Sequence, residues 1–196
     1  MTGGNVRVLG ITGSPRRNGN TEILLDEVLK GVRDSSCETV KLVLNELKIL
    51  PCQECGGCEK TGICIIKDDM QRIFDEISKA DYIFLASPIF FGSLTAQAKA
   101  MIDRFQSWWV AKYILKKPHI KEQKSGFFIC VGGQNRPDFF DNSKKIVKNF
   151  FATATISYLG DIYFPGVNEK GEIKEHPEDI KNAYDVGKKL CEGLKV

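Results

Sequence analysis

The sequence predicts an α/β fold of three layers, in which a five-stranded parallel sheet of order 2-1-3-4-5 lies between two layers of helices. Three observations predict it. Strand-like and helix-like segments alternate five times within 196 residues. The first strand-like segment is an almost continuous apolar run, as expected of a strand that is buried on both faces. The helix-like segments carry apolar residues at helical spacing, which gives each helix one face to lay on a sheet.

The first half of the chain begins with an apolar strand at residues 6–12. The spacing of leucines and valines predicts a helix over residues 21–32, and residues 39–44 alternate as a second strand. Asp68 and Asp69 then begin a helix, since two acids at a helix start suit both capping and the helix dipole.

The second half continues the same alternation. Its strands are predicted at residues 81–87, 126–131 and 156–164. Its helices are predicted at residues 94–105 (with an extension toward Trp109), 142–154 and 177–194. His119 and His176 lie near lysines and acids and are interpreted as solvated residues. Strands that alternate with helices of these lengths imply a parallel sheet covered on both faces.

Composition excludes several classes of protein. The chain is 42% hydrophobic and 27% charged, which is ordinary for a soluble protein. Its net charge of +3 comes without a dense basic cluster, so no nucleic-acid partner is expected. No apolar run reaches the roughly 20 residues of a membrane span, and no signal peptide is visible before the first strand. We therefore expect a cytoplasmic protein with reduced thiols.

The chain is expected to form a single domain over residues 1–196, with one unusual insertion at about residues 45–67. This stretch is too long for a plain connection between a strand and a helix. It contains four cysteines in the spacing C-x2-C-x2-C-x5-C, namely Cys52, Cys55, Cys58 and Cys64. A long loop inserted into a compact α/β unit is more often functional than decorative.

Four thiolates on one short loop favour a soft-metal site, and their number suits an iron–sulfur cluster. A structural zinc site with four cysteines is the nearest alternative. Zinc sites usually draw ligand pairs from two separated turns, whereas three of these cysteines are spaced at i, i+3 and i+6. Two disulfides or a redox-active C-x-x-C pair are further alternatives, which the expected compartment and the number of cysteines disfavour.

The loop after the first strand indicates an anion site, although a polar turn with an Asn or Thr cap would explain it equally well. It reads Gly13-Ser14-Pro15-Arg16-Arg17-Asn18-Gly19-Asn20-Thr21 and leads into a helix. Backbone N–H groups, hydroxyls and a helix N-terminus together attract phosphate, and Arg16 or Arg17 can supplement them. Neither G-x-x-x-x-G-K-[ST] nor G-x-G-x-x-G is present, which argues against a P-loop NTPase or a Rossmann dinucleotide site.

Two further loops favour a phosphate-bearing aromatic ligand over the polar turn. The third strand ends in Ser87-Pro88-Ile89-Phe90-Phe91-Gly92-Ser93, and the fourth ends in Gly132-Gly133-Gln134. Consecutive aromatics at the open end of a strand suit the wall of a flat ring, and glycines let backbone approach it. In the predicted order, strands one, three and four are neighbours at the topological switch point, where such sheets bind ligands. Together the loops predict an FMN site.

These loops resemble the NAD(P)H-dependent FMN reductase group of flavodoxin-like proteins. With the cysteine motif and the following Asp68-Asp69-Met70, the chain resembles an iron–sulfur flavoprotein of anaerobic prokaryotes. The resemblance runs from Val6 to about Gly133, and the rest matches only in its alternation of strand and helix. It implies a flavodoxin-like fold, FMN, a [4Fe–4S] cluster on the cysteines, assembly as a homodimer or homotetramer, and electron transfer between cluster and flavin.

The resemblance also implies roles for individual residues. The phosphate would be held by Ser14, Arg16, Asn18, Gly19, Asn20 and Thr21. The isoalloxazine would be lined by Pro88, Ile89, Phe90, Phe91, Gly92, Ser93, Gly133 and Gln134. Many relatives carry Tyr at the position of Phe90, which here keeps the aromatic surface without the hydroxyl. No catalytic residue is assigned, because the flavin supplies the chemistry and hydride arrival needs no side-chain acid or base.

We therefore expect an FMN-dependent oxidoreductase that transfers electrons as an iron–sulfur flavoprotein. NAD(P)H is its candidate reductant, and a redox protein or a small molecule is its acceptor. The alternative is an NAD(P)H-dependent FMN or quinone reductase without a cluster, whose cysteine loop binds zinc or is vestigial. A sensing module ranks lower, because no DNA-binding or effector segment supports it. Since the cysteine loop follows strand two, a cluster there need not face the flavin of its own subunit.

Overall fold

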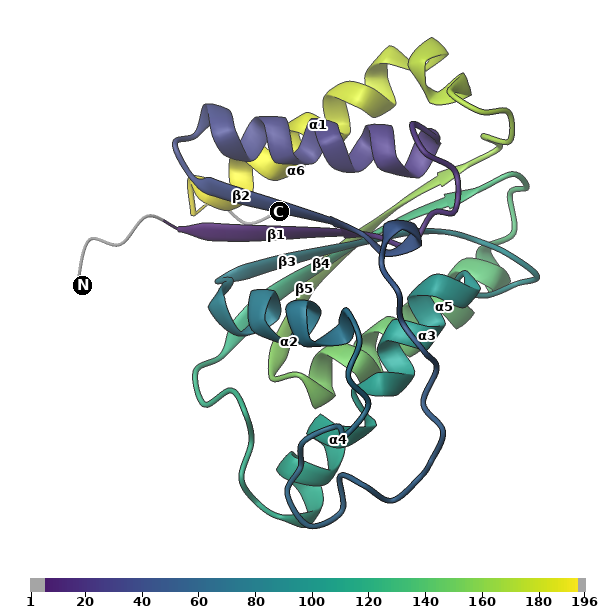
Figure 1. Cartoon of the computed structure of the whole chain (residues 1–196). Coiled ribbons are helices and arrows are strands. Elements are labelled where there is room, and N and C mark those ends of the chain that lie inside the picture. Colours follow the sequence, from purple (N-terminus) through teal and green to yellow (C-terminus); the bar gives the residue numbers. More distant parts are fainter. Residues whose placement is uncertain (1–5, 194–196) are drawn as a thin grey trace.

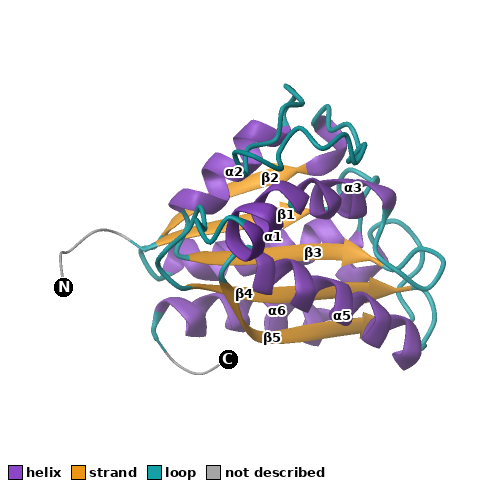
Figure 2. Ribbon diagram, turned by 90° about the horizontal axis from the view of Figure 1, so that it is seen from below, coloured by secondary structure: helices purple, strands orange, loops and turns teal. Residues whose placement is uncertain are grey.

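The computed structural model describes residues 6–193, and its centre is one parallel sheet. The strands lie in the order β2-β1-β3-β4-β5, side by side in Figure 2. Their bounds are β1 (Arg7–Thr12), β2 (Glu38–Val43), β3 (Tyr82–Pro88), β4 (Lys124–Gly132) and β5 (Ile156–Pro165). The predicted fold class and strand order are confirmed.

Helices cover both faces of the sheet (Figure 1). One face carries α1 (Asn20–Asp34) and α6 (Pro177–Cys191). The other carries α2 (Met70–Lys79), α3 (Ala96–Arg104) and α5 (Pro137–Thr153). The shorter elements are the 3-10 turns η1 (Leu44–Glu46) and η3 (Glu172–Glu175), the helix α4 (Gln106–Trp109) and the π-helical turn η2 (Val110–Ile114) that continues it. None of the helices described is both long and apolar enough to cross a membrane.

Two predicted boundaries need comment. The fourth connecting helix was expected from Asn142, which is wrong, because α5 begins five residues earlier at Pro137. Proline suits the first position of a helix, since its fixed φ is helical and its missing N–H has no partner there in any case. The predicted end of the last helix, Leu194, lies outside the described residues, as do the first five residues of the expected domain.

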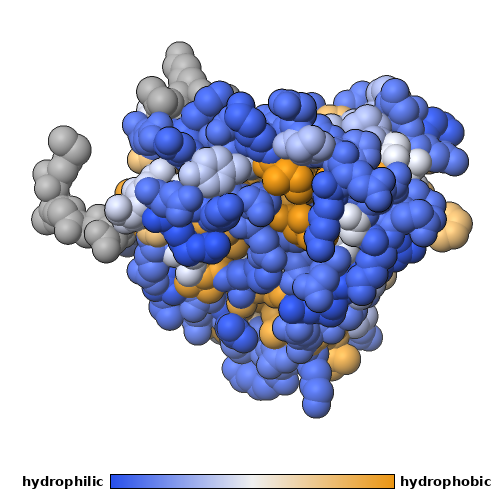
Figure 3. Space-filling model, turned by 90° about the horizontal axis from the view of Figure 1, so that it is seen from above, coloured by the Kyte–Doolittle hydropathy of each residue, from blue (hydrophilic) through white to orange (hydrophobic). Residues whose placement is uncertain are grey.

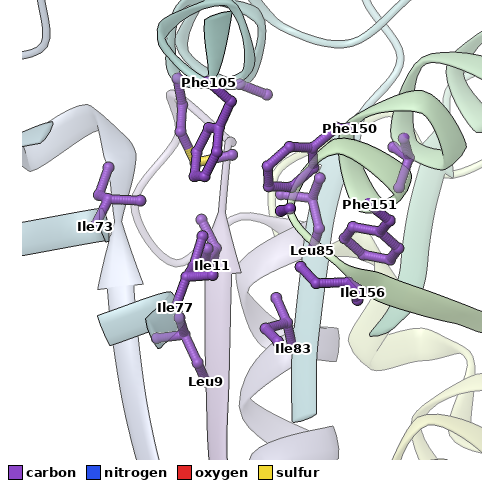
Figure 4. Close-up of a cluster of buried hydrophobic side chains, with 14 of the residues drawn as sticks. Leu9, Ile11, Ile73, Ile77, Ile83, Leu85, Phe105, Phe150, Phe151 and Ile156 are labelled. Atoms are coloured by element: carbon purple, nitrogen blue, oxygen red, sulfur yellow. The ribbon is translucent and has the colours of Figure 1, made fainter. Parts of the chain in front are cut away.

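The sheet alternates its side chains between two hydrophobic layers. Leu9 and Ile11 of β1 point toward the layer of α2, α3 and α5, whereas Val8 packs against α1 and α6. Figure 4 shows the first of these layers, where strand residues meet Ile73 of α2 and Phe150 of α5. Full burial of such a side chain stabilises the fold by about 1.5–3 kcal/mol.

The two helices on the opposite face are in unusually close contact. A Cβ added at Gly187 would lie 2.0 Å from the carbonyl oxygen of Val28, and one at Gly31 would lie 2.2 Å from that of Tyr184. Only glycine permits this approach of two backbones. Seen from outside, the face that α1 and α6 cover is mostly hydrophilic, with a small hydrophobic area near its centre (Figure 3).

Strand pairing brings three loops to one edge of the sheet. Thr12 at the end of β1 pairs with Ala86 of β3, and Pro88 at the end of β3 pairs with Val131 of β4. Because all the strands are parallel, the segments that follow β1, β3 and β4 leave from the same side. The cysteine loop takes another path: after η1 it runs away from the sheet and lies beside α4 (Figure 1).

Candidate functional site

The loop between β1 and α1 folds around its own backbone. The hydroxyl of Ser14 donates to the carbonyl of Arg16 at 3.3 Å and accepts from the Arg16 N–H at 3.2 Å. The N–H of Gly19 bonds to the same carbonyl at 3.3 Å. Gly19 is the N-cap residue of α1 and brings no side chain to cap the helix. The backbone N–H groups of the first turn are therefore left for a ligand, as in other anion sites.

The carboxylate of Glu22 holds this loop through contacts with Asn18 and Arg17. Its buried carboxylate accepts a 2.7 Å hydrogen bond from the N–H of Asn18, whose backbone is left-handed at φ 53°. It also pairs with Lys41 at 3.1 Å and with Arg17 at 3.1 Å. Burial raises the pKa of Glu22, but the hydrogen bonds from Asn18 and Lys41 outweigh it and lower the pKa below the ordinary value.

These contacts separate the roles of the two arginines that the sequence left open. Arg17 is held by Glu22 and, at 3.0 Å, by Glu46. Arg16 instead lines the small cavity beside the loop and donates to the carbonyl of Asn168 at 3.0 Å. Arg16 is thus the arginine of this loop that is placed to meet an anion.

The segment after β3 makes a tight turn that presents aromatic rings. The N–H of Phe90 bonds to the carbonyl of Ser93 at 2.8 Å, and the reverse bond is 3.1 Å. Phe91 and Gly92 lie between them with φ of 49° and 72°, as in a type I′ turn. Phe91 is fully exposed, and a left-handed backbone is costly for a bulky side chain. Strain of this kind clusters at functional sites.

Two adjoining cavities lie at this edge of the sheet. The smaller, of about 80 Å³, is lined by five residues of the loop after β1, together with Pro88 and Lys170. The larger, of about 390 Å³, is lined by the aromatic turn and by Gly133 and Gln134. Ile89, Phe90, Gly133 and Asn168 line both cavities, so the two are adjacent. A small recess beside a wider cavity with aromatic walls suits a ligand that carries both a phosphate and a flat ring.

Most of the predicted cofactor residues meet here. The small cavity is lined by Ser14, Arg16, Gly19, Asn20, Thr21, Pro88, Ile89, Phe90 and Gly133, and the large one adds Phe91, Gly92 and Gln134. Asn18 and Ser93 line neither and instead shape their turns. The side chain of Asn20 is already engaged, because it donates to the carbonyl of Glu169 at 2.8 Å and accepts from the N–H of Ile173 at 3.3 Å.

The sequence missed the contribution of the segment after β5. Val167, Asn168 and Lys170 line the small cavity, and Phe139 of α5 lines the large one. A signal was available, because β5 is parallel and its carboxyl end must reach the same edge as the other strands. The resemblance that guided the assignment ends near Gly133, which left this segment unassigned.

The four cysteines line a third cavity, which shares no lining residue with the first two. Cys52, Cys55, Cys58 and Cys64 all line a space of about 270 Å³, together with Arg104 and Trp109. Across residues 6–193, no three Cys, His, Asp or Glu side chains are grouped tightly enough to hold a single metal ion. As placed, the four thiols line one cavity but do not converge on a single point. Burial, followed by the charges of the other three cysteines, raises the pKa of Cys58.

Asp68 and Asp69 lie at the start of α2, as predicted, and they also close the base of the cysteine loop. The carboxylate of Asp69 accepts from the N–H of Lys48 at 2.7 Å and does not cap α2, which begins at Met70. Asp68 accepts from the N–H of Leu50 at 2.9 Å and from that of Met70 at 3.1 Å. The two acids therefore join the beginning and the end of the cysteine loop.

His119 also contacts the loop, which the interpretation as a solvated residue did not anticipate. Its Nε2 lies 2.9 Å from the carbonyl oxygen of Gly62, between the third and fourth cysteines. Its ring packs against the buried Trp108, with centroids 5.3 Å apart. The tip of the loop is thus seated on the segment after α4.

Known proteins resemble this chain over nearly its whole length. Residues 6–158 match the NADPH-dependent FMN reductase family. An iron–sulfur flavoprotein of Methanocaldococcus jannaschii is 29% identical over 97% of this chain and 98% of its own length. One from Archaeoglobus fulgidus is 30% identical over 97% of this chain and 81% of its own. The structure of a flavone reductase matches with a TM-score of 0.72 at 20% identity, covering 95% of this chain and 62% of that longer chain, which is a likeness of fold.

Proposed function

Because the chain belongs to the NADPH-dependent FMN reductase family and matches iron–sulfur flavoproteins over nearly its whole length, we propose that it is an electron-transferring iron–sulfur flavoprotein. Family membership makes it a flavin-dependent oxidoreductase. The proposal adds a [4Fe–4S] cluster on Cys52, Cys55, Cys58 and Cys64. The observation that carries it is that all four cysteines line one cavity, separate from the cavities at the edge of the sheet.

The residues at the sheet edge fit FMN. Arg16, Ser14 and the first-turn N–H groups of α1 would hold the phosphate, because they combine positive charge with outward donors. Phe90 and Phe91 would give the ring an apolar wall, and the backbone at Gly133 and Gln134 would approach it from β4. Bound FMN supplies both hydride and single-electron chemistry. The protein's part is to anchor the phosphate, orient the ring and set the environment of its edge.

The cysteine cavity fits a cluster better than a single zinc ion. Zinc needs four sulfurs about 2.3 Å from one centre, whereas these thiols are arranged around a space of about 270 Å³. Thiolate ligands and an enclosure partly lined by apolar side chains suit an iron–sulfur cluster. The cluster supplies single-electron chemistry when bound. The chain would contribute its four ligands and a preformed loop to hold them.

We further propose that the protein works as a homo-oligomer, with NAD(P)H as a reductant and a redox protein or small molecule as acceptor. Apolar side chains are exposed around the cysteine loop and α4, among them Ile63, Ile65 and Ile114, each more than half exposed. The cysteine cavity shares no lining residue with the FMN cavities. A second subunit that covers this apolar region could bring its own flavin to the cluster. Light scattering coupled to gel filtration tests the assembly, and a strictly monomeric protein would contradict it.

Metal and flavin analysis of anaerobically purified protein tests the main proposal. We expect iron and acid-labile sulfide in about four-to-four ratio per chain, together with one FMN. Anaerobic addition of NADPH should bleach the flavin absorbance if NAD(P)H is the reductant. Stoichiometric zinc with no sulfide would overturn the cluster and leave a plain flavin or quinone reductase.

A further inference from the structure

Arg104 is a buried cation with no part in the FMN site. It ends α3, and its side chain is 0% exposed, which makes it the largest fully buried side chain among the residues described. Burial of a guanidinium is costly unless its donors are paired, so its partners indicate its role. All of those partners belong to the cysteine loop or its base.

The partners span both ends of the loop. Nη1 donates to the carbonyl of Leu50 at 2.8 Å, before the first cysteine, and to the carboxylate of Asp68 at 2.6 Å, after the last. Nη2 donates to the carbonyl of Ile66 at 3.2 Å. The planar guanidinium thus holds the two ends of the cysteine loop in a fixed relation. A lysine ammonium could not make these contacts with the same geometry.

The guanidinium also reaches a cysteine directly. Nη2 lies 3.3 Å from Sγ of Cys64, and Arg104 lines the cavity that the four cysteines share. Its Nε is buried and has no hydrogen-bond partner among the described residues. A buried donor without an acceptor is expensive, so this side chain is held in place at a cost to stability.

We propose that Arg104 is the positioning residue of the cysteine loop, and that its hydrogen bond to Cys64 raises the reduction potential of the cluster. The inference rests on the proposed cluster. Donors to cluster sulfurs favour the reduced state, because that state carries more negative charge. The same guanidinium shapes the loop before any cluster is bound, since four of its contacts are to protein atoms.

The test compares Arg104→Gln, Arg104→Lys and the double variant Arg104→Met/Asp68→Asn with the wild type. The double variant removes both charges and so avoids a lone buried carboxylate that could prevent folding. Arg72→Gln is the matched control, because it removes an equal charge from the exposed side of α2. Iron, sulfide and FMN per chain and the cluster midpoint potential, followed by electron paramagnetic resonance, are measured on anaerobic protein.

We expect Arg104→Gln and the double variant to lose iron to a chelator faster than the wild type, and to show a more negative cluster potential with FMN content unchanged. Arg104→Lys should restore part of the potential, and Arg72→Gln should behave as wild type. Wild-type potential and chelator resistance in both Arg104→Gln and the double variant would overturn the proposal.

A measurement on metal-free protein separates failure of this inference from failure of the proposed function. If the wild type carries no iron or sulfide, the cluster itself is wrong. Hydrogen exchange of metal-free protein still reports on the loop, because the N–H of Leu50 is protected only while Asp68 holds it. We expect faster exchange near Leu50 in Arg104→Gln than in Arg72→Gln. Equal exchange in the two would refute the positioning role.

Discussion

The hydroxyl of Thr95 donates a 2.6 Å hydrogen bond to the carbonyl of Gly13, so the segment after β3 is tied directly to the loop after β1. The same oxygen accepts from the N–H of Ala98 and caps α3. Thr95 is fully buried, so both bonds are shielded from bulk solvent. One hydroxyl therefore holds two of the four segments that line the proposed FMN cavities in a fixed relation.

Thr95→Val should loosen this relation at nearly constant side-chain volume. Loss of the cap and of a buried hydrogen bond should lower the free energy of unfolding by about 1–3 kcal/mol. FMN affinity should fall as well, because both loops line its cavities. Denaturant unfolding and fluorescence titration of FMN measure the two effects. Thr95→Ser keeps the hydroxyl and serves as the control, and equal losses in both variants would contradict the role of the hydroxyl.

Phe91 should contribute to FMN binding and lower the stability of the folded protein. Its left-handed backbone costs about 1–2 kcal/mol, and Asn tolerates this conformation better. Phe91→Asn should therefore be more stable than Phe91→Ala, which lacks the ring but keeps most of the strain. Both variants should bind FMN more weakly than the wild type, since each removes an aromatic surface. Unchanged FMN affinity in the two variants would show that Phe91 has no part in the site.

Glu22 should make the stability of the loop between β1 and α1 depend on pH. Burial raises the pKa of Glu22, but the hydrogen bonds from Asn18 and Lys41 lower it by more. The pKa of the folded state therefore lies below that of the unfolded state. The stability that Glu22 contributes is present above its unfolded pKa and is lost as the pH falls through the folded value. Glu22→Gln should destabilise the protein at neutral pH by about 1–3 kcal/mol, and the difference should shrink below about pH 4.

Urea unfolding of wild type and Glu22→Gln across this pH range measures the effect. Asp26→Asn is the control, because Asp26 also pairs with Lys41 but its side chain is about half exposed. Exposed pairs contribute at most about 1 kcal/mol. A pH-independent difference between wild type and Glu22→Gln would mean that the charge of Glu22 is not the relevant property.

Cys55→Ser should remove the proposed cluster and leave FMN bound. Cys55 lines the cysteine cavity, which has no lining residue in common with the FMN cavities. We expect the variant to lose iron and sulfide while it retains FMN at wild-type affinity. Cys191→Ser, on α6 at the opposite face of the sheet, should keep both. Loss of FMN in parallel with iron would show that the two sites depend on each other.

Sequence reasoning predicted the sheet order from local patterns, and the family resemblance named most of the residues that line the two cavities at the sheet edge. Apolar runs define buried strands, and loops such as 13–21 carry their own turn residues. The contacts of Arg104 could not be predicted, since they join α3 to a loop about 40 residues earlier. A weak signal existed: Arg104 falls three residues after the buried Met101 and therefore on the inner face of α3.

Other features depend on tertiary contacts that single segments do not encode. The close approach of α1 and α6 needs Gly31 and Gly187 opposite one another, which neither helix reveals alone. Asn168 reaches the FMN cavities because β5 ends beside β4, although its own segment carries no motif. Asp68 and Asp69 have the composition of a helix start and lie at one, but the sequence does not show that they also accept from the backbone of residues 48 and 50.

The contact between Lys48 and Asp69 means that residues 49–68 leave and rejoin the α/β body at nearly one point. The N–H of Lys48 meets the Asp69 carboxylate at 2.7 Å, and the N–H of Asp69 meets the Lys48 carbonyl at 3.1 Å. A segment with such a closed stem can be lengthened, shortened or exchanged without moving the strands that feed it. The cysteine loop, with its proposed cluster, is in this sense a unit with its own stem, set apart from the strand ends that line the sheet edge.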